Sequence, residues 1–355
     1  MVDVSVDDPT LDWTTPGVYE AAPHVYRIPL PLPQDGLRAV NVYAIMAGDE
    51  LVLIDSGWAI AEARDQLGQA LGALGAGLGD VGRYLITHAH QDHYTQAVTL
   101  RREFGSSISV GKGEQAQLDL INAPAENARP AFEGRLLLAG ATGLLERLRA
   151  FGRRTADPSV WEYPDAWLSD RDVVSVGDRQ LEAIATPGHT RGHVVFLEGA
   201  TKLLFAGDHV LPHITPSIGF EGAAVDFPLR DYLESLRLVR SLPDTVLLPA
   251  HGPTGGSTHR RIDELLDHHD RRLEVIYRAV ERGGSCAAEV AGMITWTRRE
   301  RKLDELGLFN EMLAVLETLS HLDVLVLQGR LSMSLVDGAR RYELADGVGS
   351  ASVVG

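Results

Sequence analysis

The chain has 355 residues, of which 45% are hydrophobic and 23% charged, so its composition is typical of a globular protein and excludes a disordered one. A formal net charge of −16 argues against a nucleic-acid partner, because such partners are bound mainly through clustered basic side chains. No apolar run reaches the roughly 18 residues that a transmembrane helix needs, so no membrane span is expected.

Two features bear on the cellular compartment. The N-terminus is acidic and lacks a basic segment followed by an apolar stretch, so no secretion signal is expected. Cys286 is the single cysteine, which excludes an intramolecular disulfide and fits a reducing environment. Together they predict a cytoplasmic protein.

The first 110 residues alternate between strand and helix patterns. Runs rich in β-branched and aromatic residues indicate strands, and the turn at 47–49 predicts a hairpin between the second and third of them. The expected elements are strands at 24–28, 40–45, 50–55, 83–86 and 108–110, and helices at 59–74 and 94–104.

Residues 114–154 have helical spacing of their leucines, which predicts a helical insertion. Such an insertion serves either as a lid over a site or as a helical hairpin that only packs on the core, and the sequence leaves both interpretations open. Strands are then expected at 173–176, 181–185, 194–197, 202–205 and 245–248, with a helix at 227–242.

The character of the chain changes after residue 256. Three helices at 260–281, 286–295 and 309–327 precede a hairpin with an Asp337-Gly338 turn, and this is the outline of a winged helix. We therefore expect a first domain at 1–256, a second at 257–346 and a flexible tail at 347–355. The basic cluster at 298–302 is interpreted as a solvated helix end rather than a nucleic-acid contact.

The segment from Thr87 to His93 contains three imidazoles and a carboxylate. His88 and His90 are two residues apart in an extended stretch, so both can reach one ion. Asp92 and His93 follow after a turn and can face a second ion. Histidine and aspartate suit zinc or another first-row divalent ion such as manganese or iron.

Three later residues repeat one pattern, in which an apolar strand and a small residue precede a histidine or an aspartate. Such strand ends gather at one edge of a sheet, where a scaffold presents its catalytic groups. The candidate metal ligands are therefore His88, His90, Asp92, His93, His189, Asp208 and His251.

These residues also carry a family resemblance. T-H-A-H-Q-D-H at 87–93, T-P-G-H-T at 186–190, G-D-H at 207–209 and P-A-H-G at 249–252 resemble the metallo-β-lactamase-fold hydrolases over roughly residues 24–256. The end of the chain resembles the winged-helix appendage of the lactamase-beta-2-like branch. The resemblance implies an α+β fold, a four-layer αββα sandwich with a small C-terminal helical domain.

The resemblance also implies a role for each ligand. One ion would be held by His88, His90 and His189. A second would be held by Asp92, His93 and His251, with Asp208 bridging the two. Asp55, in an I-D-x-G element, would support the metal loop from behind.

Three groups of histidines are interpreted differently. His193, His209 and His213 lie close to the motifs but match no ligand position, so packing, support of the ligands or substrate contact is expected of them rather than metal binding. His268 and His269, on a charged helix, are expected to be solvated. His24, His259 and His321 carry no functional signal.

The sequence therefore predicts a binuclear metal-dependent hydrolase that attacks with a hydroxide bridging two divalent ions, with Asp92 and Asp208 as catalytic residues. The apolar, proline-containing stretch 209–218 and the charge favour a small, partly apolar thioester, ester or lactone. An endoribonuclease and, from another class, a metal-binding winged-helix regulator are the alternatives; a β-lactam substrate is disfavoured without an export signal. Exposed apolar helices would permit a homodimer.

Overall fold

The computed structural model describes residues 4–33, 36–123, 131–151, 157–223, 225–297 and 299–345. By their internal contacts, the described residues form two compact units. Unit 1 comprises Met1–Ala128, Ala156–Pro216 and Tyr232–Glu264, and unit 2 comprises Arg129–Thr155, Ser217–Asp231 and Leu265–Gly355. The domain boundary at residue 256 remains a prediction; unit 1 extends to Glu264, and two earlier segments group with the residues from Leu265 onward.

The first sheet of unit 1 follows the chain order from β1 to β8. The predicted hairpin is confirmed, because β4 and β5 pair antiparallel around Gly48, whose φ of +62° suits glycine. From β5 onward the neighbours are parallel. The strands are β1 Val4–Val6, β2 Val18–Ala22, β3 Val25–Pro31, β4 Ala39–Ala47, β5 Glu50–Ile54, β6 Val81–Ile86, β7 Ser107–Gly111 and β8 Ala166–Leu168.

The second sheet has the order β13-β12-β11-β10-β9. β10, β11 and β12 pair antiparallel in turn, and β12 pairs parallel with β13. Consequently β10, β12 and β13 all run in the same direction, and their carboxyl ends lie at one edge of the sheet. The strands are β9 Asp172–Val176, β10 Arg179–Ala185, β11 Val194–Glu198, β12 Leu203–Gly207 and β13 Val246–Pro249.

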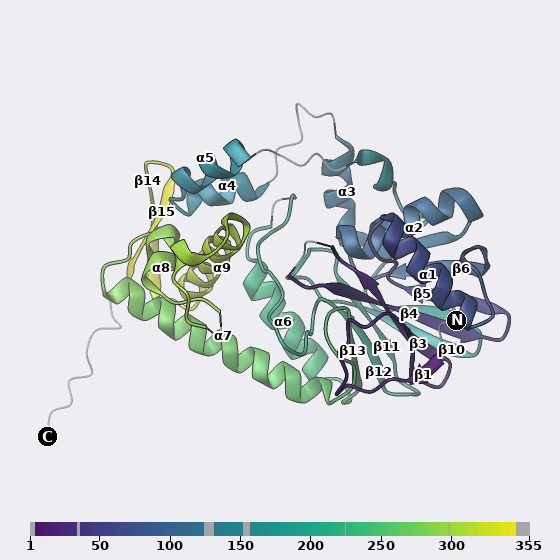
Figure 1. The fold of residues 1–355 in the computed structure, drawn as a ribbon. Helices are drawn as coiled ribbons and strands as arrows, with labels where there is room; N and C mark the ends of the chain where they lie inside the picture. The colour runs from purple at the N-terminus through teal and green to yellow at the C-terminus, as the bar shows by residue number, and fades with distance from the viewer. Residues whose placement is uncertain are drawn as a thin grey trace, which may run out of the picture. The chain divides into compact units, whose positions relative to one another are not determined.

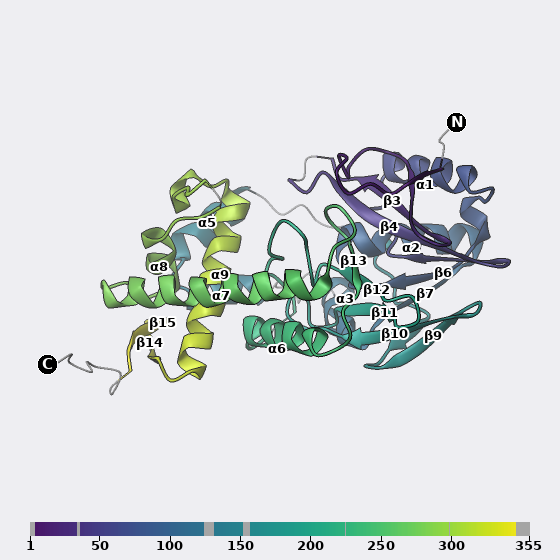
Figure 2. The same cartoon turned by 90° about the horizontal axis from the view of Figure 1, so that it is seen from below.

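Two apolar cores hold unit 1 together. One lies between the two sheets and includes Ile45, Phe196 and Phe205. The other lies between the first sheet and α1 Ala61–Ala73 and α2 Gln91–Phe104, with Leu67 and Tyr94 wholly buried. Figures 1 and 2 show α1 and α2 on the outer face of the first sheet and α6, Pro228–Arg240, on the side of the second sheet. Unit 1 is thus the predicted four-layer αββα sandwich.

Unit 2 contains helices and one hairpin. The insertion supplies α4 Ala131–Leu138 and α5 Thr142–Phe151, both of which contact α9 Leu308–Leu327. The end of α7 Thr258–Glu281, α8 Ala287–Met293 and the antiparallel pair β14 Leu331–Val336 and β15 Ala339–Leu344 complete it. The predicted three helices and hairpin are present, and their assignment as a winged helix stays a prediction. The expected tail at 347–355 lies outside the described residues.

The structure corrects several sequence-based boundaries. α2 begins at Gln91, three residues before its predicted start, so Asp92 and His93 lie in its first turn. The predicted insertion at 114–154 contains α3 Gln115–Asn122 as well as α4 and α5, while residues 124–130 and 152–156 lie outside the described part of the chain. β1, β2 and β8 were not expected, because three to five residues give little periodic signal.

Candidate metal centre

The candidate ligands occupy one edge of the two sheets because their strands end there. His88 follows β6, and the parallel strands β10, β12 and β13 run toward His189, Asp208 and His251. The sharp turns after these strands need glycine: Gly207, before Asp208, has φ of +50°, and a Cβ there would lie 2.7 Å from the side chain of Thr87.

Four residues form what we term the first donor set, with one ligand atom of each within 4.8 Å of the others. His90 Nδ1 lies 3.0 Å from His189 Nε2, and His189 Nε2 lies 3.4 Å from Asp208 Oδ2. Two imidazole nitrogens this close both present lone pairs to the same point unless a proton or a cation lies between them. The first donor set is His88, His90, His189 and Asp208.

The second donor set is Asp92, His93 and His251. His251 Nε2 lies 3.4 Å from Asp92 Oδ2, and His93 Nε2 lies 3.5 Å from the same oxygen. Asp208 also faces this set, since its Oδ1 lies 3.4 Å from His251 Nε2 and 3.7 Å from His93 Nε2. One oxygen of Asp208 thus faces each donor set, which is the geometry expected of a bridging carboxylate.

The chemistry of the donor atoms fits divalent ions. His88 Nε2, His93 Nε2, His251 Nε2 and Asp208 Oδ1 are buried and have no hydrogen-bond partner among the described residues. Buried polar atoms are normally hydrogen-bonded, so four orphaned atoms in one cluster indicate a missing partner. Nitrogen and carboxylate donors in sets of three and four are those of zinc and related ions.

The opposite ring nitrogens are used by the protein. Asp55 Oδ2 accepts a hydrogen bond from His93 Nδ1 at 2.8 Å, and its carboxylate accepts from the backbone N–H and the hydroxyl of Thr87. His88 Nδ1 lies 3.0 Å from the Thr87 hydroxyl, and His251 Nδ1 donates to the Ala39 carbonyl at 2.8 Å. These bonds leave Nε2 of each ring as the atom directed to the site. Asp55 itself has φ of +60°, a conformation that non-glycine residues rarely adopt.

Burial and the neighbouring carboxylates together set the pKa values of the imidazoles. Burial lowers the pKa of His88 well below its usual value, so this ring is neutral. Burial would also lower the pKa of His93, but the surrounding carboxylates, Asp92 first among them, raise it to about 10. Burial would raise the pKa of Asp92, yet His93 and His251 hold it below its usual range. A cation that takes His93 Nε2 must therefore displace a proton.

The remaining candidate histidines differ in their placement. His193 is buried and accepts a hydrogen bond at Nε2 from the backbone N–H of Asp208 at 3.1 Å, with Nδ1 2.8 Å from the Thr186 hydroxyl. It therefore holds the bridging residue in place. His209 is buried against the ring of Tyr232, and burial lowers its pKa to about 3. His213 is exposed and belongs to neither donor set.

Sequence reasoning missed the residues that hold the ligand loops. The Tyr232 hydroxyl donates to the His209 carbonyl at 3.0 Å, and the Ser235 hydroxyl donates to the Pro187 carbonyl at 2.9 Å. The Asn41 side chain donates to the carbonyls of Pro249 and Gly252 on either side of His251. No sequence signal marks these residues, since each acts through backbone atoms far away in the chain.

The stretch expected to contact substrate is only partly accessible. Val210, Leu211 and Ile218 are buried, so they pack in the interior, whereas Ile214 is 43% exposed. His269, expected to be solvated, is instead buried at 1% exposure, because its face of α7 packs against α9. None of the described helices is long and apolar enough to cross a membrane.

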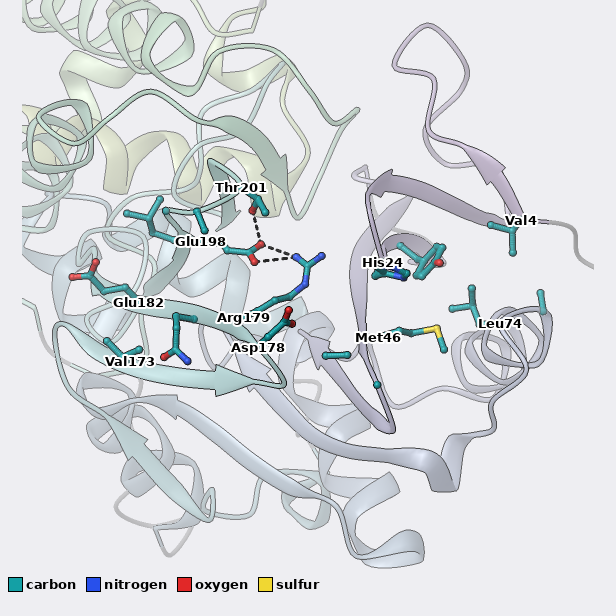
Figure 3. Close-up of a pocket in the computed structure, with 18 residues that line it drawn as sticks. Val4, His24, Met46, Leu74, Val173, Asp178, Arg179, Glu182, Glu198 and Thr201 are labelled. Carbon is teal, nitrogen blue, oxygen red and sulfur yellow. Dashed lines mark hydrogen bonds and ion pairs between the residues drawn. The ribbon is translucent and has the colours of Figure 1, made fainter.

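A cavity of about 1250 Å³ in unit 1 lies at the other ends of the strands (Figure 3). It is lined by the start of β10 at Arg179 and the end of β11 at Glu198, and the two side chains form an ion pair at 2.8 Å. β10 runs from this cavity to the ligand loop, about 20 Å at the usual rise per residue. None of the candidate ligands lines this cavity.

Comparison with known proteins agrees with the fold and the site. The family model of the metallo-beta-lactamase superfamily matches residues 35–251, more than half of the chain. The chain therefore belongs to the metallo-beta-lactamase superfamily and is a metallo-hydrolase. The family expected from the motifs is confirmed.

Three similar proteins extend this comparison. A beta-lactamase domain protein from Burkholderia ambifaria is 28% identical and superposes with a TM-score of 0.78, covering 96% of this chain and 98% of that one. A probable metallo-hydrolase of Bacillus subtilis, YqjP, is 26% identical over 84% of this chain and 90% of its own length. An atrochrysone carboxyl ACP thioesterase from Aspergillus fumigatus is 26% identical over 69% of this chain and 61% of its own.

Proposed function

We propose that the protein hydrolyses a thioester, or a related ester or lactone, of a small and partly apolar metabolite, using two divalent ions held by the two donor sets. The observation that supports two ions is the placement of Asp208, whose Oδ2 faces the first donor set and whose Oδ1 faces the second. The similarity to a thioesterase supports the substrate class. Zinc is the proposed metal, and manganese or iron suits the same ligands.

Two bound divalent ions would supply a polarised water and neutralise negative charge that develops on the acyl oxygen. The residues of the chain prepare that chemistry. His88, His93 and His251 direct their Nε2 atoms to the site because their Nδ1 atoms are held by the protein. The Asp92 side chain is 20% exposed and lies beside His93 and His251, where its carboxylate can accept a hydrogen bond from the attacking water.

The proposed hydrolysis proceeds without a covalent enzyme intermediate. The oxygen of water forms a bond to the acyl carbon, the carbon–sulfur bond breaks, and a proton of the water passes to the departing thiolate, while Asp92 accepts a hydrogen bond from the attacking water. For an ester or lactone the departing atom is oxygen. The products are a carboxylic acid and a thiol or alcohol.

The test is a hydrolysis panel on the zinc-loaded protein, with acyl-CoA, S-lactoylglutathione, a lactone, nitrocefin and single-stranded RNA. Turnover of a thioester or a lactone is expected. Turnover of nitrocefin alone would contradict the proposed substrate class, and RNA cleavage would favour the endoribonuclease alternative. Metal content measured on the same sample establishes the number of ions.

The ligands are tested by His189→Ala and Asp208→Ala, each of which should reduce kcat by about 100-fold or more, since it removes a metal contact. His24→Asn is the matched control: His24 lines the distant cavity and has φ of +62°, which asparagine tolerates. Full activity in either alanine variant, with its metal content verified, would contradict the mechanism.

We further propose a cytoplasmic enzyme that forms a homodimer. A small-molecule substrate is expected in a cytoplasmic enzyme, and the single Cys286, buried at 3% exposure, suits a reducing compartment. A homodimer is part of the proposal, and light scattering in solution tests it.

A further inference from the structure

Glu114 is a buried carboxylate that belongs to neither donor set. It ends the 3-10 helix Lys112–Glu114, precedes α3 and has 0% exposure. Its side chain makes no capping hydrogen bond to α3. A buried carboxylate is costly unless it accepts hydrogen bonds, and this one accepts from the hydroxyl of Thr190, which is 1% exposed. This bond links Glu114 to a loop 76 residues later in the chain.

The backbones around this bond are in direct contact. A Cβ at Gly192 would lie 2.1 Å from the backbone nitrogen of Glu114, and a Cβ at Gly111 would lie 2.0 Å from the Gly192 carbonyl oxygen. A Cβ at Gly113 would lie 2.7 Å from the Arg191 carbonyl oxygen. Only glycine permits these close approaches. The backbones of the two segments are therefore closely packed, and Glu114 and Thr190 meet at a defined position.

This contact between the two segments joins the two sheets beside the first donor set. Glu114 follows β7 in the first sheet, whereas Thr190 lies in the loop between β10 and β11 of the second sheet. The first donor set likewise takes His88 and His90 from beside the first sheet and His189 from the second. The nearby backbone bond from Val194 N to the Thr87 carbonyl, at 2.8 Å, joins the same sheets without contacting His189.

Thr190 follows His189 directly in the chain. The Thr190 carbonyl accepts a hydrogen bond from Gly188 N at 3.0 Å, so the residues on either side of His189 are bonded to each other. We propose that Glu114 is a positioning residue which, through Thr190, holds His189 against His90 and so sets the affinity of the first donor set for its ion. This proposal rests on the proposed function only in taking the first donor set to bind a divalent ion.

The test is Thr190→Val, which removes the hydroxyl and keeps the shape. Zinc affinity is measured with a competing chelator, and the cobalt-substituted protein is examined by visible absorption. Loss of a partner behind a metal ligand lowers affinity by about 10–100-fold, so the first ion should bind at least about tenfold more weakly and the cobalt spectrum should change. The second ion should bind as before. Thr190→Ser keeps the hydroxyl and should restore both readouts.

Thr201→Val is the matched control. The Thr201 hydroxyl donates to the buried carboxylate of Glu198 at 2.6 Å, the same kind of bond at the distant cavity (Figure 3). This variant should leave metal affinity and the cobalt spectrum unchanged.

Glu114→Ala provides an independent measurement. It should weaken the first ion as Thr190→Val does, and the double variant should lose less than the sum of the two single losses, because both act through one bond. Wild-type metal affinity in Thr190→Val, or additive losses in the double variant, would overturn the proposal. If Thr190→Val and Glu114→Ala weaken metal binding as expected but the protein hydrolyses no panel substrate, the proposed function alone is contradicted.

Discussion

Each histidine of the second donor set uses one ring nitrogen for the protein and leaves the other for the site. Asp55 does this for His93, and it also holds the Thr87 backbone that leads into His88. The carboxylate thus serves both donor sets from a single strand end. An early aspartate in an I-D-x-G element was expected to have this role from the resemblance, and the structure places Asp55 in contact with these two residues.

Asp55→Asn is predicted to weaken metal binding by about 10–100-fold, because an amide replaces the carboxylate that accepts the hydrogen bond from His93. Isothermal titration of the metal-free protein with zinc measures the change. Circular dichroism at the same temperature verifies that the variant is folded. Unchanged zinc affinity would show that Asp55 does not orient the ligand.

At the scale of elements, the ligand loops depend on close backbone packing. Gly188 precedes His189 with φ of +141°, and a Cβ there would lie 2.5 Å from the Cα of Tyr232 in α6. The motif T-P-G-H therefore contains its glycine because a helix backbone occupies the place of a side chain. This reason is invisible until α6 is placed against the loop.

Gly188→Ala is predicted to destabilise the protein by about 1–3 kcal/mol through overpacking, and to displace His189. Thermal unfolding and zinc affinity measure the two effects. Gly199→Ala is the control, because a Cβ at Gly199 meets nothing within 4 Å. Equal melting temperatures for the two variants would contradict the prediction.

A second feature at this scale is the histidine pair between α7 and α9. His321 Nδ1 donates to the Glu317 carbonyl, so its Nε2 accepts from His269 Nδ1 at 3.1 Å. Burial lowers the pKa of His321 from 6.5 to about 3 and that of His269 well below 6.5, and the neighbouring His268 and Arg272 act in the same direction. Both rings are neutral in the folded protein.

This pair is predicted to reduce stability in acid. Below pH 6.5 the unfolded chain binds protons that the folded chain does not, so the free energy of unfolding falls toward pH 3 and is unaffected above 6.5. Each histidine contributes about 1.4 kcal/mol per pH unit. Urea unfolding of the zinc-loaded protein at pH 7.5 and pH 5 measures the fall, which the double variant His269→Phe/His321→Leu should reduce. An equal fall in wild type and variant would exclude the pair as its cause.

At the scale of the whole molecule, the chain has a net charge of −16, and its candidate metal centre combines imidazoles and carboxylates from two sheets. Divalent ions held by residues from both sheets would bind the folded state in preference to the unfolded chain. Removing them should therefore destabilise the fold, by about 4 kcal/mol relative to free metal at 1,000 times its Kd. Calorimetry with and without a chelator tests this, and His189→Ala should respond less to the chelator than the wild type does.

The same charge predicts no binding of nucleic acid. Arg299, Arg301 and Lys302 are exposed, but Glu300 lies among them. A gel shift with single-stranded RNA and duplex DNA at low salt should show no complex, because few phosphates are neutralised. A complex that weakens steeply with salt would instead support the winged-helix regulator or the endoribonuclease.

The sequence by itself determined the candidate ligands, their order and the strands that lead to them. His88, His189, Asp208 and His251 each follow a strong apolar run, and such local patterns survive whatever the rest of the chain does. The hairpin of β4 and β5 was readable for the same reason, because its strands and turn are contiguous.

The tertiary structure decided everything that depends on distant partners. Burial of His269 required α9 to cover one face of a helix that is charged in sequence, and the bond between Glu114 and Thr190 required two sheets to meet. The two faces of Asp208 toward the donor sets likewise arise only when β6, β10, β12 and β13 end together. Local sequence encodes which side chains can ligate, while packing between elements decides which of them meet and what holds them there.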